Sequence, residues 1–303
     1  YEFFRNAATD ARNFFAPANE KDPRYQRNQF GFSLGGPMRR NRTFLFAGFE
    51  GRRVREGITR VTNVPTALER SGDFSQSGLP FLIDPFTQQP FPGNRIPANR
   101  ISPIGANIAA LYPLPNRSGK GQNFVSSPLF IDRNDQFDAR LDHKLGQASD
   151  LILRYSFTDR AFREPFGGTS FAQVPGYGND VPRRAQNLMA GHTHAFTPTL
   201  LNEFRAAFSR VANQVIGQDR ELNLNKQVGL PVVSSNPRDF GLSFMTVPGF
   251  SSLGHEYNNP QSGVTNTYQV IDHATWVNGR SSVKFGLEYR KLQQNAFRDV
   301  QSR

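Results

Sequence analysis

The sequence predicts an all-β protein built from antiparallel strands, and three observations support this. Strand-like segments recur in pairs, and only a short polar turn separates the two members of each pair. Long polar stretches rich in Gly and Pro separate one pair from the next. Within the segments, apolar and polar residues alternate as in a strand with two different faces. Short turns that alternate with long loops are typical of an outer-membrane β-barrel, in which the turns are periplasmic and the loops extracellular.

Four hairpins carry most of the predicted strands. The last hairpin has Asn278-Gly279 at its turn, which is a strong short-range hairpin signal. A further strand begins at Tyr1, so we expect about nine strands, too few for a large transporter barrel. The eight paired strands are predicted at Gln26–Gly36, Thr43–Glu56, Asp135–Leu145, Leu151–Arg160, Arg184–Phe196, Leu200–Arg210, Val264–Val277 and Val283–Lys291.

The alternation predicts which side chains face lipid and which face the barrel lumen. We expect Leu153, Phe157, Phe285 and Leu287 to face lipid, because the residues between them are polar. Around 188–196 neither face is clearly apolar, and no assignment follows there. We expect the lumen-facing residues to form a ladder of mixed charge in which opposite charges pair across strands. The lumen-facing candidates are Asp138, Arg140, Arg154, Glu203, Arg205, Glu288 and Arg290.

Composition narrows the class of protein. The chain has 28 Phe but one Trp, and only 37% of its residues are hydrophobic. The formal net charge of +11 comes mainly from arginines scattered along strands and turns, with no nucleic-acid-binding motif, so we expect no nucleic-acid partner. Cysteine is absent, which excludes disulfides and Cys-based metal sites. No apolar run has the length of a membrane helix.

One stretch matches a catalytic motif. Gly31-Phe32-Ser33-Leu34-Gly35 has the G-x-S-x-G spacing of the nucleophile elbow of serine hydrolases. The elbow requires a helix directly after the serine, whereas Gly35-Gly36-Pro37 breaks any helix. Ser33 is therefore expected in a hairpin, and we predict no catalytic residue and no enzyme activity.

Two further patterns resemble metal sites. The segment Asp132–Asp138 has the spacing of a calcium loop, but Phe137 stands where Gly is needed and His143 where Glu is needed. His192 and His194 share a strand face, but two ligands do not complete a metal site. We therefore predict no metal and no cofactor, and interpret Asp132–Asp138 as the polar start of a strand.

The longest loop, 57–134, is expected to be ordered. Apolar residues recur along it, and many prolines restrict its backbone. The segment Ile101–Leu111 has apolar spacing that allows one short helix near Pro103–Tyr112, with Ser102 as its N-cap. We therefore predict an extracellular cap with one short helix, folded over the mouth of the barrel.

An ordered set of short motifs gives the chain a family resemblance. The set includes Tyr1-Glu2-Phe3-Phe4-Arg5-Asn6, Asp10-Ala11-Arg12-Asn13-Phe14-Phe15, Ser71-Gly72-Asp73-Phe74-Ser75, Pro92-Gly93-Asn94-Arg95-Ile96-Pro97, Leu201-Asn202-Glu203-Phe204-Arg205 and Val283-Lys284-Phe285-Gly286. With these motifs the sequence resembles the barrel of TonB-dependent outer-membrane receptors, specifically the Oar-like group common in Acidobacteria. The resemblance extends over nearly the whole chain.

This resemblance implies a fold, a location and partners. Members are similar to 22-stranded transporters with a plugged lumen, so residues 1–303 are expected to form the N-terminal part of such a barrel, without the plug and the regulatory-like domain. Expected partners are lipid of the Gram-negative outer membrane, an unknown extracellular ligand, and the TonB complex through the missing N-terminal region. TonB-dependent uptake is the implied function. The alternatives are a non-transporting surface protein with loops for adhesion or assembly, and a soluble sugar-binding β-domain.

Overall fold

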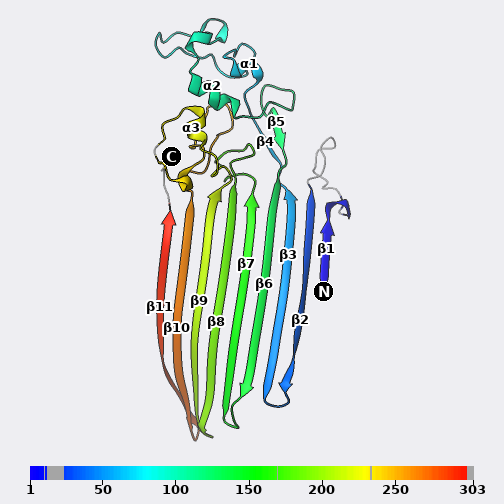
Figure 1. Ribbon diagram of the computed structural model, residues 1–303, viewed down its shortest axis with the longest axis vertical. Helices are drawn as coiled ribbons and strands as arrows, with labels where there is room; N and C mark the ends of the chain where they lie inside the picture. Colours follow the sequence, from blue (N-terminus) through cyan, green and yellow to red (C-terminus); the bar gives the residue numbers. More distant parts are fainter. Residues whose placement is uncertain (10, 12–23, 169, 233, 299–303) are drawn as a thin grey trace.

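The computed structural model describes residues 1–9, 11, 24–168, 170–232 and 234–298. One antiparallel sheet forms a wall whose long loops all leave at one end and whose short turns lie at the other (Figure 1). The sheet is open, as expected for part of a larger barrel. The motif at Asp10–Phe15 lies almost entirely outside the described residues. Among the residues described, no helix is both long and apolar enough to cross a membrane.

Within the described ranges the main sheet has nine strands, in agreement with the prediction of about nine. Most are longer than predicted because their upper ends lose the apolar alternation while the backbone pairing continues. In sheet order they are β1 (Glu2–Asn6), β2 (Tyr25–Arg39), β3 (Thr43–Gly57), β6 (Leu129–Lys144), β7 (Ser149–Glu164), β8 (Asn179–Thr197), β9 (Leu200–Gly217), β10 (Gln261–Asn278) and β11 (Ser281–Arg298).

The strand register sorts the side chains of the wall onto two faces. Leu153 lies opposite Leu141 on one side and Ala190 on the other, and this row continues through Ala206 and Val270. Residues directly opposite each other share a face, so these side chains define what we call the apolar face. Phe157, Phe285 and Leu287, which we expected beside Leu153, share this face. We call the opposite side the ladder face.

Aromatic rings cross the apolar face in a band. Phe49, Phe137 and Phe157 are consecutive cross-strand neighbours, and Phe208 lies opposite Tyr268 one row lower. The ring centroids of Phe208 and Tyr268 are 5.1 Å apart. We call these five residues the aromatic row. An apolar surface bordered by aromatic rings is typical of a barrel exterior at the membrane interface.

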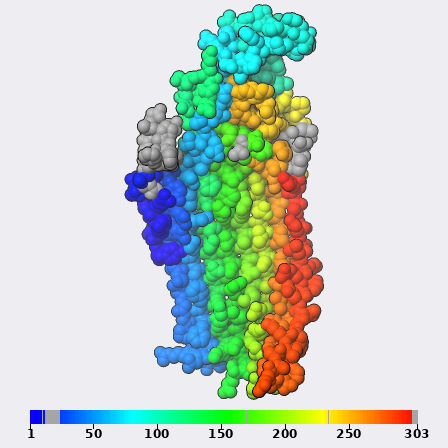
Figure 2. Space-filling model, turned by 180° about the vertical axis from the view of Figure 1, so that it is seen from behind, coloured from blue at the N-terminus to red at the C-terminus, as the bar shows by residue number. Residues whose placement is uncertain are grey.

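Three loops, 58–128, 165–178 and 218–260, fold together into a cap. Figure 2 shows it as a continuous mass at one end of the wall. Its helices are α1 (Ala67–Arg70), α2 (Pro103–Ala110) and α3 (Leu224–Val228), and its small sheet pairs β4 (Arg60–Thr62) with β5 (Phe124–Ser126). Single 3₁₀ turns occur at Ala7–Thr9, beside the wall, and in the cap at Pro92–Asn94, Ala98–Arg100 and Pro237–Asp239.

The predicted cap helix is present as α2. Ser102 caps it by accepting a hydrogen bond from the amide of Gly105 at 3.4 Å, and Pro103 occupies the first turn. The helix ends at Ala110, before the predicted Tyr112. The sequence did not predict α1 and α3, which have only four and five residues and therefore show no helical periodicity.

The cap has its own hydrophobic core, drawn from all three loops. Its buried members are Val64, Tyr112, Phe124, Ala172, Val174, Tyr177, Leu224, Val228, Leu242 and Leu253. Buried polar groups within it are paired: the Tyr112 hydroxyl donates to the Ser251 carbonyl at 2.6 Å, and Asn123 bonds both the amide and the carbonyl of Val64 at 2.8 Å. The loops therefore form one packed unit, whereas the sequence predicted order for 57–134 alone, and the buried core residues of that loop are Val64, Tyr112 and Phe124.

Candidate ligand site under the cap

A cavity of about 440 Å³ lies where the cap meets the upper part of the ladder face. Its floor comes from the upper ends of β6 to β10, and its rim from the loops that follow β3, β7 and β9. Arginines, carboxylates and aromatic rings all line it. The lining side chains relevant to ligand binding are Arg60, Phe130, Phe162, Glu164, Phe166, Arg183 and Glu256.

Guanidinium groups lie over the aromatic rings of this cavity. The Cζ atom of Arg183 is 5.0 Å from the ring centroid of Phe162, and Arg60 is 5.7 Å from that of Phe166. Phe130 packs beside Phe162 at 6.1 Å. Such stacking holds the arginines in fixed positions while leaving their outer N–H groups able to donate. The arrangement suits a ligand that is both planar and anionic.

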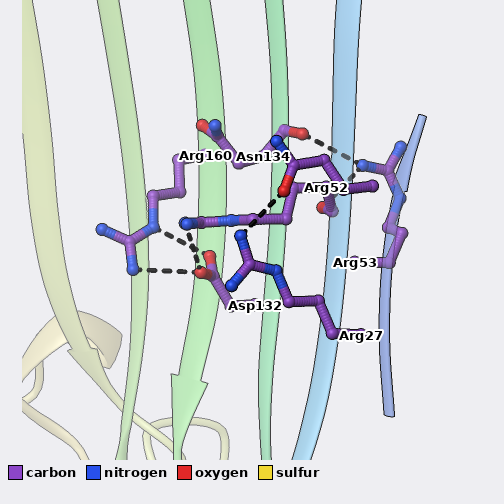
Figure 3. Close-up of polar contacts among 7 residues, drawn as sticks. Arg27, Arg52, Arg53, Asp132, Asn134 and Arg160 are labelled. Atoms are coloured by element: carbon purple, nitrogen blue, oxygen red, sulfur yellow. Dashed lines mark hydrogen bonds and ion pairs between the residues drawn. The ribbon is translucent and has the colours of Figure 1, made fainter. Parts of the chain in front are cut away.

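A second arginine group lies next to the cavity on the ladder face, around Asp132 (Figure 3). Asp132 is buried and accepts hydrogen bonds from Arg160 at 2.8 and 3.1 Å and from Arg52 at 2.9 Å. Arg27 lies beside this group and donates to Gln29 at 2.7 Å. Arg27, Arg52 and Arg160 outnumber the two nearby carboxylates, Asp132 and Glu50, so the group keeps a net charge of +1, which attracts anions toward the cavity.

Carboxylates at the cavity rim hold the cap loops together. Glu256 accepts a hydrogen bond from the amide of Gly168 at 2.8 Å and another from Asn259 at 3.2 Å. The Asn259 side chain also donates to Asn179 at the top of β8. Glu164 accepts from Asn179 at 3.4 Å. Glu256 therefore joins two cap loops and Glu164 joins β7 to β8, while the contact between Asn259 and Asn179 links the cap to the wall.

All seven predicted ladder residues lie on one face of the wall. Arg140 lies opposite Arg154, and Glu203 and Arg205 lie opposite His273 and Ile271. Their ion pairs differ from the expectation, because they run along single strands between residues two apart instead of across strands. These pairs are Arg140–Asp142 at 2.8 Å, Arg205–Glu203 at 3.6 Å and Arg290–Glu288 at 2.8 Å.

The contacts that do cross strands in the ladder join a charged group to a polar side chain. Ser156 donates to Asp138 at 2.5 Å, His273 contacts Glu203 at 2.6 Å, and Gln269 donates to Glu288 at 2.8 Å. At Arg140 the physical reason is visible: like charges face each other across β6 and β7, so Arg140 pairs with Asp142 on its own strand instead. None of the seven lines the cavity under the cap.

The histidines considered as metal ligands lie together on β8. The His192 and His194 rings stack with centroids 6.0 Å apart, and His192 contacts the Ser149 hydroxyl at 2.7 Å. Both lie on the apolar face, opposite Leu151 and Ser149, close to the short turns. In the described part of the chain, no three His, Cys, Asp or Glu side chains come together as a metal site.

The other two motifs lie in the wall. Ser33 is within β2, with no helix after it, so the geometry of a nucleophile elbow is not formed. Asp132–Asp138 lies within β6, as the interpretation of a polar strand predicted. Sequence reasoning recognised Asp132 as polar but missed its partners, which come from β3 and β7.

The solved structures that show similarity to the chain include two outer-membrane proteins. One is the outer membrane transporter YddB from Escherichia coli, with 8% identity and a TM-score of 0.47 over 90% of this chain and 26% of that one. The other is BauA, the ferric preacinetobactin receptor from Acinetobacter baumannii, with 11% identity and a TM-score of 0.44 over 93% of this chain and 36% of that one. The chain thus spans between a quarter and about a third of these proteins.

A search of curated proteins finds no match. The family described as "Outer membrane beta barrel domain" matches residues 1–303, which is the whole chain. This match agrees with the antiparallel wall, its apolar face and its long loops on one side. The chain belongs to the outer-membrane β-barrel family, and its location is the outer membrane of a Gram-negative bacterium.

Proposed function

We propose that this chain forms part of the barrel wall of a TonB-dependent receptor that takes up an extracellular ligand. In this proposal the ladder face lines the lumen, and the ligand first binds in the cavity under the cap. The observation that carries the proposal is the placement of arginines and aromatic rings together beneath an ordered cap. The order of the sequence motifs supports the TonB-dependent part, with the TonB complex acting through a region outside this chain.

The charges around the cavity favour an anionic ligand. Arg60 and Arg183 line it, while Arg52 and Arg160 lie beside it with a surplus of positive charge over Asp132. The carboxylates of the rim already accept hydrogen bonds from cap and wall groups. A planar anion could stack on Phe162 or Phe166 and accept hydrogen bonds from the guanidinium groups.

Binding can be tested with a small probe of this chemistry. The probe is 2-naphthalenesulfonate, and 2-naphthylmethanol serves as its neutral match. For the purified, membrane-inserted protein we expect the sulfonate to bind more tightly than the alcohol. The double variant Arg60→Gln and Arg183→Gln should weaken sulfonate binding by about tenfold for each lost charged hydrogen bond. Arg290→Gln, on the ladder face far from the cavity, is the matched control.

Uptake needs a separate measurement. Accumulation of the sulfonate should be followed in cells that produce the protein, with and without a functional TonB complex. Accumulation that requires both TonB and the two cavity arginines supports the full proposal. Binding without TonB-dependent accumulation would refute energised uptake while leaving the binding site intact. Equal binding of sulfonate and alcohol would refute the anionic preference.

One observation favours the alternative of a surface protein without transport. The outer tip of the cap exposes Phe81, Ile83 and Phe86, with Phe86 83% exposed. Apolar groups gathered at an exposed tip suit contact with another macromolecule. Loss of cell aggregation or surface attachment in a Phe81→Ser and Phe86→Ser variant, with sulfonate binding unchanged, would support adhesion.

A further inference from the structure

Above the aromatic row, the apolar face changes from apolar to basic. On β9, Phe208 is followed by Arg210 on the same face, and on β7, Phe157 is followed by Asp159 and then Arg163. Across β3, β6, β7, β8 and β9 this strip contains six arginines and three aspartates. We call it the outer belt, and its members are Arg53, Arg55, Arg133, Arg163, Arg184, Arg210, Asp135, Asp159 and Asp180.

Ion pairs within the outer belt involve all three aspartates but only four of the six arginines. Asp135 accepts from both Arg53 at 2.6 Å and Arg133 at 2.9 Å. Arg163 pairs with Asp180 at 2.8 Å, and Arg184 with Asp159 at 2.9 Å. The remaining two arginines pair with no carboxylate of the belt: Arg210 donates to the amide oxygen of Asn266 at 3.0 Å, and Arg55 is exposed. The belt therefore carries three positive charges in excess.

The guanidinium groups of the belt remain accessible. The side chains of Arg133, Arg163 and Arg184 are each more than half exposed although each is paired. An arginine has five N–H donors and uses one or two of them on a carboxylate. The belt thus offers a row of charged donors that point away from the ladder face and the cavity.

The position of the outer belt determines which molecules it can contact. The apolar face below it, bordered by the aromatic row, is the part of the wall that lies against hydrocarbon. The belt begins one or two steps above that border, on the side of the cap, and therefore lies at the head groups of the outer leaflet. A ligand in the lumen cannot reach it, because the sheet itself stands between.

We propose that the outer belt binds the phosphate groups of phosphorylated lipids in the outer leaflet. Arginine recognises phosphate through two parallel N–H bonds, which fixes the lipid against the wall as well as attracting it. The attraction of basic residues to an anionic membrane surface is about fivefold in affinity for each residue. This role is independent of uptake and of the cavity under the cap.

The test uses three arginines whose loss leaves every aspartate paired. In the variant Arg55→Gln, Arg133→Gln and Arg210→Gln, Asp135 keeps Arg53 and the other pairs are untouched. The probe is diphosphoryl lipid A, and its affinity for the purified protein is measured in detergent micelles. We expect the variant to bind this lipid about a hundredfold more weakly, with a smaller dependence on salt. Monophosphoryl lipid A should bind the wild type more weakly than the diphosphoryl form.

The control variant moves the same loss of charge to the other face. Arg140→Gln, Arg154→Gln and Arg205→Gln lie on the ladder face and should leave lipid binding unchanged. Arg133→Gln alone should weaken lipid A binding about fivefold. This single variant replaces the triple variant if the triple variant does not insert. Three results would each overturn the proposal. The first is an equal loss of lipid A binding in the control variant, and the second is an unchanged affinity for lipid A in Arg133→Gln and the triple variant. The third is displacement of bound lipid A by millimolar inorganic phosphate as strong as its displacement by free lipid.

Discussion

The wall and the cap place their apolar side chains in opposite ways. In the cap, Leu242 and Leu253 are completely buried against residues from three different loops. In the wall, Leu287 is 75% exposed and Phe285 61% exposed, and both lie on the same face as Leu153. Cap loops and wall strands alternate along the same chain, yet among the described residues the buried hydrophobic cluster lies in the cap.

The difference shows that the two regions are stabilised in different solvents. The apolar groups of the cap gain free energy by leaving water for each other. Among the described residues, the apolar face of the wall has no such partner, and its stability depends on lipid and on backbone hydrogen bonds between strands. Substitutions should therefore act in the cap through packing and in the wall through the side of the sheet on which they lie.

The largest effect is expected from Leu242→Ala in the cap core. Removing a completely buried leucine side chain leaves a cavity and should lower the stability of the cap by about 2–5 kcal/mol. Protease digestion of intact cells and hydrogen exchange of cap amides measure this loss. The matched control is Leu222→Ala in the same loop, where the leucine is half exposed and the effect should be small. An equal loss of stability in the wall would contradict the independence of the two regions.

Leu153→Arg should have the next largest effect, this time on the wall. A charge on the lipid side near the middle of the bilayer costs about 2–4 kcal/mol. Urea titration of the protein folded into lipid vesicles measures the change. Ser156→Arg places the same charge on the ladder face of the same strand, beside Asp138, and should be tolerated. If the two variants lost the same stability, the assignment of faces would be wrong.

Alkaline pH should loosen the cap before the wall. Burial, helped by the nearby charge of Asp219, raises the pKa of Tyr177 to about 12. The folded cap thus holds this phenol neutral, and its contribution is complete below the unfolded pKa near 10. It falls as the pH rises from there through the folded value, by up to roughly 1.4 kcal/mol per pH unit. Tyr177→Phe should remove this part of the pH dependence in hydrogen-exchange or unfolding measurements.

The wall was predictable from sequence because its signal is local. Alternation within Leu151–Thr158 or Val283–Arg290 identifies a strand and its faces without knowledge of any neighbour. The strand ends were missed where polar residues on both faces, as at Arg160–Glu164, hide the alternation. The histidines of β8 show the same limit, since their face becomes clear only from the pairing with β7.

The cavity and the Asp132 group were not predictable, because they depend on strand register and loop packing. Asp132 meets Arg52 from β3 and Arg160 from β7 only in one alignment of the three strands. A shift of one residue would move both arginines to the other face. The charged pairs of the ladder depend on register in the same way. Arg140 and Arg154 were each expected to pair with an opposite charge across strands, and the register places them opposite each other.

The smallest effect is expected from Thr66→Ala, at the start of α1 in the cap. Thr66 and Glu69 form a capping box: the Thr66 hydroxyl accepts from the Glu69 amide at 3.2 Å, and the Glu69 carboxylate accepts from the Thr66 amide at 2.7 Å. Losing the cap should cost about 1 kcal/mol. The effect should reach α2 only weakly, because Arg70 still donates to the carbonyls of Tyr112 and Pro113.

Hydrogen exchange of the α1 amides measures this change directly. Faster exchange should be confined to the first turn of α1. Thr66→Ser should restore protection because serine keeps the accepting hydroxyl. The wall shares no packed core with α1, so its amides should exchange as in the wild type. Faster exchange along β3 or β6 would mean that the cap helps to hold the strands together, and the contrast between a water-stabilised cap and a lipid-stabilised wall would then fail.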